Sequence, residues 1–389
     1  MAIWKEKMRK LLAFCFLLVV FSLGLIQLGE GIPLFGRQYG LECQSCHLQP
    51  PKLNLHGEAF AVSGKSKAVP IAAHSAIPLS VWASGRFQDN NVRNYSKGTF
   101  NRVEIISGGF IGSTSLRYFV EWLPVSNQVE SNGTIRKRSG RFEDLLITIP
   151  IKSDFSATVG QFRPLAQVDV SRRLSVSEPL AFASGIPGTK AGNSRINSLR
   201  SFSPSGRAPT ARINFSRVSA DDGVSGLYAN LALTFPGEIV IPLMDSLSRI
   251  SNGFALEGIP KGGFFEAYYK NNLSSIGFHG FAGNGRDMIQ AVGVAEYQRV
   301  TSTLALGVAR ERIDGVRLRR YSWDVEWTPV PYIGVGSRWD DKAGPGNRQA
   351  LFNYLNLEWP LTTFAIRLTL ERRWQTGNNE TFLEWGIIF

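Results

Sequence analysis

The chain has 389 residues, of which 43% are hydrophobic and 19% charged, and its formal net charge is +12. This composition excludes a disordered chain and a polytopic helical membrane protein, and the length suits one large all-β domain or two ordinary domains. The Lys and Arg residues are scattered, without a basic run or a nucleic-acid-binding motif, so we expect no nucleic-acid partner.

The N-terminus has the pattern of a targeting segment. Four cationic residues lie between positions 5 and 10, an apolar run covers 11–28, and Gly29 and Gly31 supply small residues near a cleavage site. We predict a signal peptide over 1–31, which means that the remaining chain is exported. An uncleaved membrane anchor is the alternative, because the apolar run is at the lower length limit for a membrane-spanning helix.

The next feature is a C-x-x-C-H motif formed by Cys43, Cys46 and His47. Two thiols at this spacing can each add to a haem vinyl group, and the adjacent histidine can bind the iron. A dithiol redox pair does not need the histidine, and a zinc site needs two further ligands that no second C-x-x-C supplies. The motif therefore predicts one covalent haem c, with Cys43 and Cys46 as attachment points and His47 as the proximal axial ligand.

The distal iron ligand is open among the remaining His and Met residues. His56 is nearest to the motif in sequence and is the first candidate for the distal axial position. The other candidates are His74, His279, Met244 and Met288. The haem segment, 32–76, is too short to enclose a haem with a core of its own, so the rest of the chain must supply the walls.

From position 77 onward, apolar and polar residues alternate with period two. In one stretch Tyr321, Trp323, Val325 and Trp327 alternate with Arg320, Ser322, Asp324 and Glu326. A strand places these two sets on opposite faces, whereas a helix would scatter them around its surface. The pattern therefore predicts strands with one apolar face and one polar face.

We identify sixteen such segments, most of about the ten residues that cross a bilayer when tilted. They lie near 77–88, 102–111, 114–123, 141–150, 153–163, 209–218, 225–235, 262–271, 274–283, 287–298, 301–312, 317–328, 331–341, 349–359, 363–374 and 380–389. The longer links, 89–101, 124–140, 164–208 and 236–261, follow odd-numbered strands, and mostly short turns follow even-numbered ones. This asymmetry predicts a transmembrane antiparallel β-barrel of about 16 strands over 77–389, with both barrel ends on the periplasmic, short-turn side. A soluble β-sandwich or a lipocalin-like barrel is the alternative.

Two further features favour an outer-membrane barrel. Trp122, Trp327, Trp359 and Trp385 lie near strand ends, where an apolar ring with a polar N–H suits the lipid–water interface. The chain ends on Phe389, like the terminal strands of outer-membrane barrels. We expect the long link 165–208 to fold into the lumen and narrow it, because a link of this length in a barrel is usually functional.

The motif region resembles the fused monohaem cytochrome–porins of bacterial outer membranes. The resemblance rests on 37–47 with its C-x-x-C-H motif, followed by P-x-L-N (Pro51 to Asn54) and G-x-x-F (Gly57 to Phe60). It implies an electron-transfer protein that takes electrons from an extracellular donor, Fe(II), and passes them to a periplasmic c-type cytochrome or another carrier. Two alternatives stay open: a diffusion porin whose haem segment is only a plug, and a haem peroxidase-like enzyme.

Overall fold

The computed structural model describes residues 45–50, 52–54, 57, 79–91, 94–111, 114–129, 133–137, 140–164, 173–175, 207–219, 225–235, 262–271, 273–283, 286–297, 299–311, 317–343, 348–360, 365–375 and 378–388. The predicted signal peptide lies outside these residues. Among the described residues, no helix is long and apolar enough to cross a membrane.

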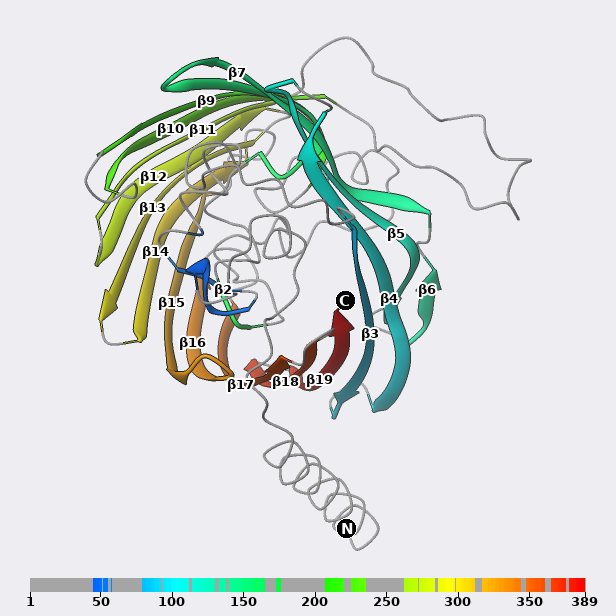
Figure 1. Cartoon of the computed structure of the whole chain (residues 1–389). Coiled ribbons are helices and arrows are strands. Elements are labelled where there is room, and N and C mark those ends of the chain that lie inside the picture. The colour runs from blue at the N-terminus through cyan, green and yellow to red at the C-terminus, as the bar shows by residue number, and fades with distance from the viewer. Residues whose placement is uncertain are drawn as a thin grey trace, which may run out of the picture.

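The wall of the molecule consists of antiparallel strands in chain order. The wall strands are β3 (Leu79–Asn90), β4 (Tyr95–Phe110), β5 (Arg117–Val129), β7 (Arg141–Lys152), β8 (Phe155–Phe162), β9 (Ala208–Val218), β10 (Gly226–Thr234), β11 (Gly262–Lys270), β12 (Ser274–Gly283), β13 (Arg286–Tyr297), β14 (Val300–Glu311), β15 (Arg317–Val330), β16 (Ile333–Ala343), β17 (Arg348–Pro360), β18 (Ala365–Gln375) and β19 (Asn378–Ile388). The last strand pairs with the first, from Ile388 opposite Trp82 to Glu380 opposite Asn90, and this pairing closes the sheet. The closed ring of strands is evident in Figure 1, and it confirms the prediction of a 16-strand all-β barrel.

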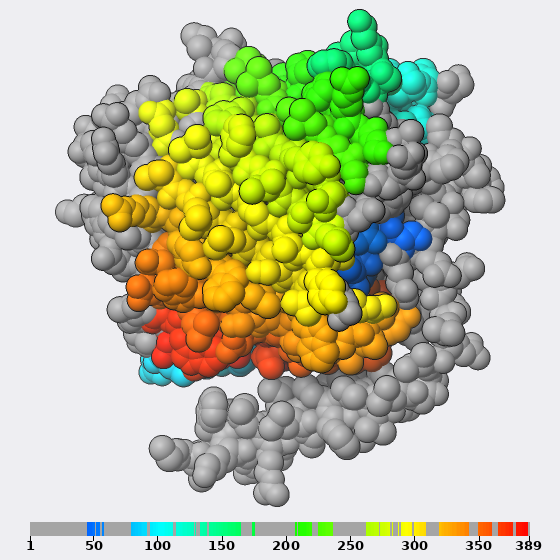
Figure 2. Space-filling view, turned by 90° about the vertical axis from the view of Figure 1, so that its left-hand side faces the viewer, coloured from blue at the N-terminus to red at the C-terminus, as the bar shows by residue number. Residues whose placement is uncertain are grey.

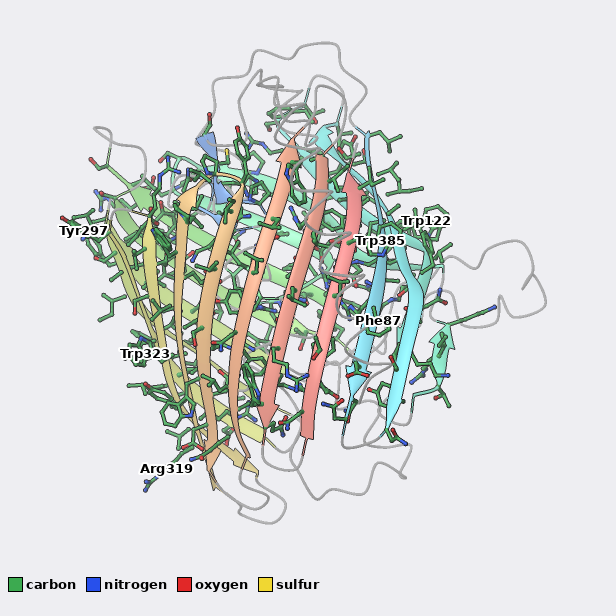
Figure 3. The ribbon with its side chains drawn as sticks, turned by 90° about the horizontal axis from the view of Figure 1, so that it is seen from below. Phe87, Trp122, Tyr297, Arg319, Trp323 and Trp385 are labelled. Carbon is green, nitrogen blue, oxygen red and sulfur yellow. The ribbon has the colours of Figure 1, made fainter. Side chains whose placement is uncertain are left out.

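The barrel buries polar residues and exposes apolar ones. On β15 the side chains of Ser322, Asp324 and Glu326 are buried, whereas Trp323 and Trp327 are exposed. Figure 3 shows Phe87, Trp122, Tyr297, Trp323 and Trp385 on the outside of the barrel. This distribution is the reverse of a soluble protein, and it matches a barrel with an apolar band facing lipid and a polar interior.

Several charged groups inside the barrel are arranged in pairs. Arg367 Nη2 lies 2.8 Å from Glu358 Oε2 on the neighbouring strand, and its guanidinium lies 4.4 Å from the centre of the Trp82 ring. On β16, Arg338 Nε lies 3.1 Å from Asp340 Oδ2. Such pairing is required because a buried charge without a partner costs several kcal/mol, roughly 3–5 when one partner is removed.

The structure corrects the predicted link 89–101. The strands continue to Asn90 and resume at Tyr95, so only 91–94 separates β3 from β4, with Asn94 at φ 51° in the left-handed region. The residues 95–100 show no apolar alternation and are mostly exposed on β4, so they did not resemble a membrane strand. Within the predicted link 124–140, β5 extends to Val129 and a short strand, β6 (Ile135–Lys137), pairs with it.

The outward position of Leu231 on β10 gives a test of the alternation. This side chain is 63% exposed near the middle of its strand. Leu231→Arg should destabilise the folded barrel by about 2–4 kcal/mol, the cost of a cation at the bilayer midplane. Urea unfolding in lipid vesicles measures this, with Leu231→Phe as a control that keeps the surface apolar. Equal stability of the two variants would show that this face does not contact lipid.

Candidate functional site

The haem-motif region forms a two-stranded hairpin inside the barrel. We call β1 (His47–Gln49) and β2 (Lys52–Leu53) the N-terminal hairpin; Gln49 pairs with Lys52 across its turn. Figure 1, which looks along the barrel, shows β2 within the ring of strands, and Figure 2 shows these blue residues at one edge of the wall. The hairpin therefore occupies the lumen close to one rim.

Hydrogen bonds fix the hairpin turn to β17. Gln49 is fully buried, and its Nε2 donates to the main-chain oxygen of Asn356 at 3.0 Å. Asn356 Nδ2 in turn donates to the carbonyl oxygen of Pro50 at 3.3 Å. These two bonds run in opposite directions between the same two segments, so they define the position of the turn along the strand.

An ion pair fixes the hairpin to β15. Lys52 Nζ contacts Glu326 Oε2, and both side chains are almost completely buried. Without the hairpin, Glu326 would face the lumen lacking its cation. A buried pair contributes little net stability compared with apolar residues, but removal of one partner is strongly destabilising, so the pair specifies which surfaces meet.

The long link after β8 reaches the same part of the wall. Leu174 N donates to Glu326 Oε1 at 2.7 Å, and Arg338 Nη1 donates to Ser175 Oγ at 2.6 Å. Leu174 also packs in a buried cluster with Ala350, Phe352 and Tyr354 of β17. The described part of the link therefore lies in the lumen; its residues 165–172 and 176–206 lie outside the described residues.

The motif itself is tied to the segment that follows it. Asn54 N donates to Cys46 O at 3.0 Å, and Asn54 Nδ2 donates to Ser45 O at 3.2 Å. Asn54 Oδ1 accepts a bond of 2.8 Å from Gly57 N. A Cβ atom at Gly57 would collide with the Cys46 carbonyl oxygen, so only glycine permits this approach. Asn54 of the P-x-L-N pattern and Gly57 of the G-x-x-F pattern thus hold the motif backbone.

The structure describes only some of the predicted haem-binding residues. Cys46 and His47 are half-buried, whereas the nearby anchors Gln49 and Lys52 are buried. Cys43 and His56 lie outside the described residues, as do the alternative ligands His74 and Met244. Met288 belongs to β13, and His279 is buried on β12 with Nε2 3.0 Å from Gln290 Oε1. The hydrogen bonds and the ion pair described above join the hairpin to β15 and β17, and none of them joins it to β12 or β13.

The part of the predicted donor set that the structure describes, Cys46 and His47, is compatible with a covalent haem c. The attachment needs thiols and an imidazole that remain reachable, and Cys46 and His47 are only half-buried whereas Gln49 and Lys52, which anchor the hairpin, are buried. Gly57 lies directly against the main-chain carbonyl oxygen of Cys46, so the motif backbone is supported at this point. Cys43, Cys46 and His47 would hold the group.

A second charged cluster lies on β4, β5 and β7. Carboxylate oxygens of Glu104, Glu121 and Glu143 lie within 4.8 Å of one another. Arginines neutralise this cluster: Arg102 Nη1 is 2.5 Å from Glu104 Oε1, and Arg207 Nη1 is 3.1 Å from Glu143 Oε2. The carboxylates already have guanidinium partners. Through these ion pairs the cluster binds Arg207, at the end of the long link, to the barrel wall.

Comparison with known proteins supports the architecture. No family model and no curated protein matches this chain. OmpF of Salmonella typhi, in complex with daunomycin, has a TM-score of 0.51 at 9% identity, over 80% of this chain and 97% of that chain. OprB of Pseudomonas putida has a TM-score of 0.47 at 10% identity, over 80% and 93% of the two chains. The outer membrane channel DcaP of Acinetobacter baumannii has a TM-score of 0.46 at 9% identity, over 80% and 96%.

The likeness to OmpF is one of fold. Together with the apolar outer band and the polar interior, it identifies the chain as a porin-like 16-strand β-barrel. The predicted location in the bacterial outer membrane is confirmed.

The environment of Cys46 gives a pH-dependent prediction. Burial raises the pKa of the Cys46 thiol, because the thiolate loses solvation. In the haem-free protein carrying Cys43→Ser, alkylation of Cys46 should therefore rise at higher pH than in the same chain unfolded in urea. At neutral pH the folded protein should react more slowly, since less thiolate is present. Rates measured by mass spectrometry across a pH series test this, and a midpoint equal to or below that of the unfolded chain would contradict it.

Proposed function

We propose that this protein is an outer-membrane electron conduit, in which a haem c held by the N-terminal hairpin serves transfer from an extracellular donor to periplasmic carriers. The observation that carries the proposal is the position of the motif: its hairpin is anchored to the inner wall of the barrel by Lys52 and Gln49. A motif intended for a separate soluble domain would not need buried bonds to a membrane barrel.

The residues of this chain would act mainly by positioning. Cys43 and Cys46 would fix the group through thioether bonds, and His47 would bind the iron. When bound, a haem c supplies one-electron redox chemistry. Asn54 holds the motif backbone through the Ser45 and Cys46 carbonyl oxygens, which limits the movement of the motif relative to the N-terminal hairpin. His56 remains our first candidate for the distal ligand.

The place of the hairpin along the barrel supports transfer to the periplasm. Its wall contacts Glu326 and Asn356 lie near the ends of β15 and β17, and Gly334 lies beside the turn between β15 and β16. This rim also holds the first residue of β3 and the last of β19. In outer-membrane barrels the short turns face the periplasm. A periplasmic carrier would thus meet the hairpin at this rim.

The donor we propose is Fe(II), on the strength of the resemblance around the motif. An iron(II) ion would lose one electron and leave as iron(III), and a periplasmic c-type cytochrome would gain that electron. A diffusion porin with a haem-bearing plug is the second candidate, favoured by the fold shared with OmpF. The two differ in one measurable property, since a porin lets the donor itself cross and a conduit passes only electrons.

Covalent attachment is the first requirement of the proposal. In a host that matures c-type cytochromes, the unaltered protein should keep its haem on a denaturing gel. Cys43→Ala and Cys46→Ala should each weaken haem staining, and the double variant should abolish it, because each thiol makes one of the two bonds. Undiminished staining of the double variant would remove the haem c assignment.

Electron transfer is tested in lipid vesicles that contain the purified barrel and a trapped soluble c-type cytochrome. Addition of Fe(II) outside should reduce the trapped cytochrome, whereas the Cys43→Ala, Cys46→Ala barrel should match protein-free vesicles. A ferrous chelator trapped in parallel vesicles reports entry of the ion itself. Equal reduction by both proteins together with chelator colouring would support the porin with a plug. Peroxide consumption without any reduction would support the peroxidase-like enzyme.

A further inference from the structure

We propose that Glu326 is a shared latch that holds the N-terminal hairpin and the long link after β8 in the lumen as one unit, so that release of either segment loosens the other. The inference concerns the seating of two segments in the barrel and does not depend on haem or on electron transfer. Glu326 is thus a positioning residue on the inner face of β15.

The two oxygens of one carboxylate serve the two segments. Glu326 Oε2 contacts Lys52 Nζ of the hairpin, and Oε1 accepts the 2.7 Å bond from Leu174 N of the link. Tyr354 Oη lies 2.8 Å from Oε1 and also contacts Asp324 Oδ1. A phenol has one proton, so Tyr354 can donate to only one of these carboxylates at a time. Beside this hydroxyl of the wall, Lys52 and Leu174 supply the two donors to Glu326 that come from the hairpin and the link.

A second contact point lies next to this carboxylate. A Cβ atom at Gly334 of β16 would collide with both Gln49 Oε1 of the hairpin and Leu174 Cδ1 of the link. The absence of a side chain at this position lets both segments lie on the same spot of the wall. The hairpin and the link thus share two wall residues, one by hydrogen bonds and charge and the other by close packing.

This arrangement makes the two segments interdependent. Loss of Lys52 leaves Glu326 as a buried charge without its cation, which favours movement of the carboxylate toward water. That movement withdraws the acceptor from Leu174 N, and a buried main-chain donor without an acceptor is itself unfavourable. The remaining hold on the link in this region is the bond from Arg338 to Ser175 and the packing of Leu174.

The proposal also accounts for the position of the described residues of the long link. Its ends follow β8 and precede β9 at the rim opposite the hairpin, yet Leu174 contacts Glu326 near the hairpin rim and Ser175 contacts Arg338 in the middle of β16. Arg212 Nη1 of β9 lies 3.5 Å from the Pro164 carbonyl oxygen, so the link is already bonded to an inward-facing side chain at its start. Leu174 thus lies away from the two ends of the link, and Glu326 provides the acceptor that holds it there.

The test uses a thiol reporter on the link and changes on the hairpin. The reporter is Ser175→Cys. Ser175 is only 5% exposed, so a cysteine at this position should be protected from a charged, membrane-impermeant maleimide in the otherwise unaltered barrel. Cys43 and Cys46 are replaced by serine throughout, and the protein is purified without residues 1–31, which contain Cys15, so that one thiol is left. Lys52→Met and Glu326→Gln should each raise the labelling rate at the reporter by roughly tenfold or more, as expected when one partner of a buried charge pair is lost. Lys52→Arg, which keeps the charge, should restore protection.

Glu384→Gln provides the matched control. Glu384 is another buried, inward-facing glutamate, but it pairs with Arg86 of the wall and contacts neither segment in the bonds described. It should leave the labelling rate unchanged. Protection that persists in Lys52→Met would show that the segments are seated independently, and an equal rise in all variants would show general loosening; either result overturns the latch. If Glu326→Gln fails to insert as a heat-modifiable barrel, Lys52→Met decides alone, because Lys52 is not part of the wall.

Discussion

The closure of a β-sheet within lipid is the constraint on which the rest of this structure depends. Every main-chain polar group must find a partner in a neighbouring strand, and pairing of β19 with β3 removes the two edges that an open sheet would expose. The same closure turns one face of every strand to lipid and the other to the lumen. Apolar side chains such as Leu231 and Ile276 therefore lie outside, and charged side chains such as Asp340 and Glu371 are buried inside.

A lumen lined with charged groups is also a surface that can bind polar segments. Arg367 with Glu358 and Arg338 with Asp340 are neutralised within the wall, whereas Glu326 obtains its cation from Lys52 of the N-terminal hairpin. The interior thus contains a position whose charge balance requires a segment from outside the wall. That requirement connects the membrane fold to the cysteine–histidine motif, because the segment that carries the motif is held against the barrel wall.

The strands could be predicted from the sequence because their signal is local. Each wall strand repeats the alternation imposed by lipid, as in Trp323 and Trp327 against Asp324 and Glu326, and all sixteen were identified with most bounds within a few residues. The residues 95–100 were missed since their strand shows no apolar alternation. In the candidate site, the motif was readable because its chemistry depends on fixed spacing. The position of the motif in the barrel could not be predicted from the sequence. It depends on the bond from Gln49 to Asn356 and on the contact of Lys52 with Glu326, and contacts across some 300 and 270 positions leave no local pattern.

The central claim is that the N-terminal hairpin is seated on the inner face of β15 to β17, and cross-linking tests it most directly. In the Cys43→Ser, Cys46→Ser background, Gln49→Cys is combined with Asn356→Cys on β17 or with Asn230→Cys on β10, which lies almost opposite in the ring. A short bifunctional thiol reagent is applied to the folded barrel in lipid vesicles, and linked peptides are identified by mass spectrometry. The account predicts an efficient link between positions 49 and 356 and none between 49 and 230. Equal linking to both walls, or linking to neither while both single thiols react freely, would contradict it.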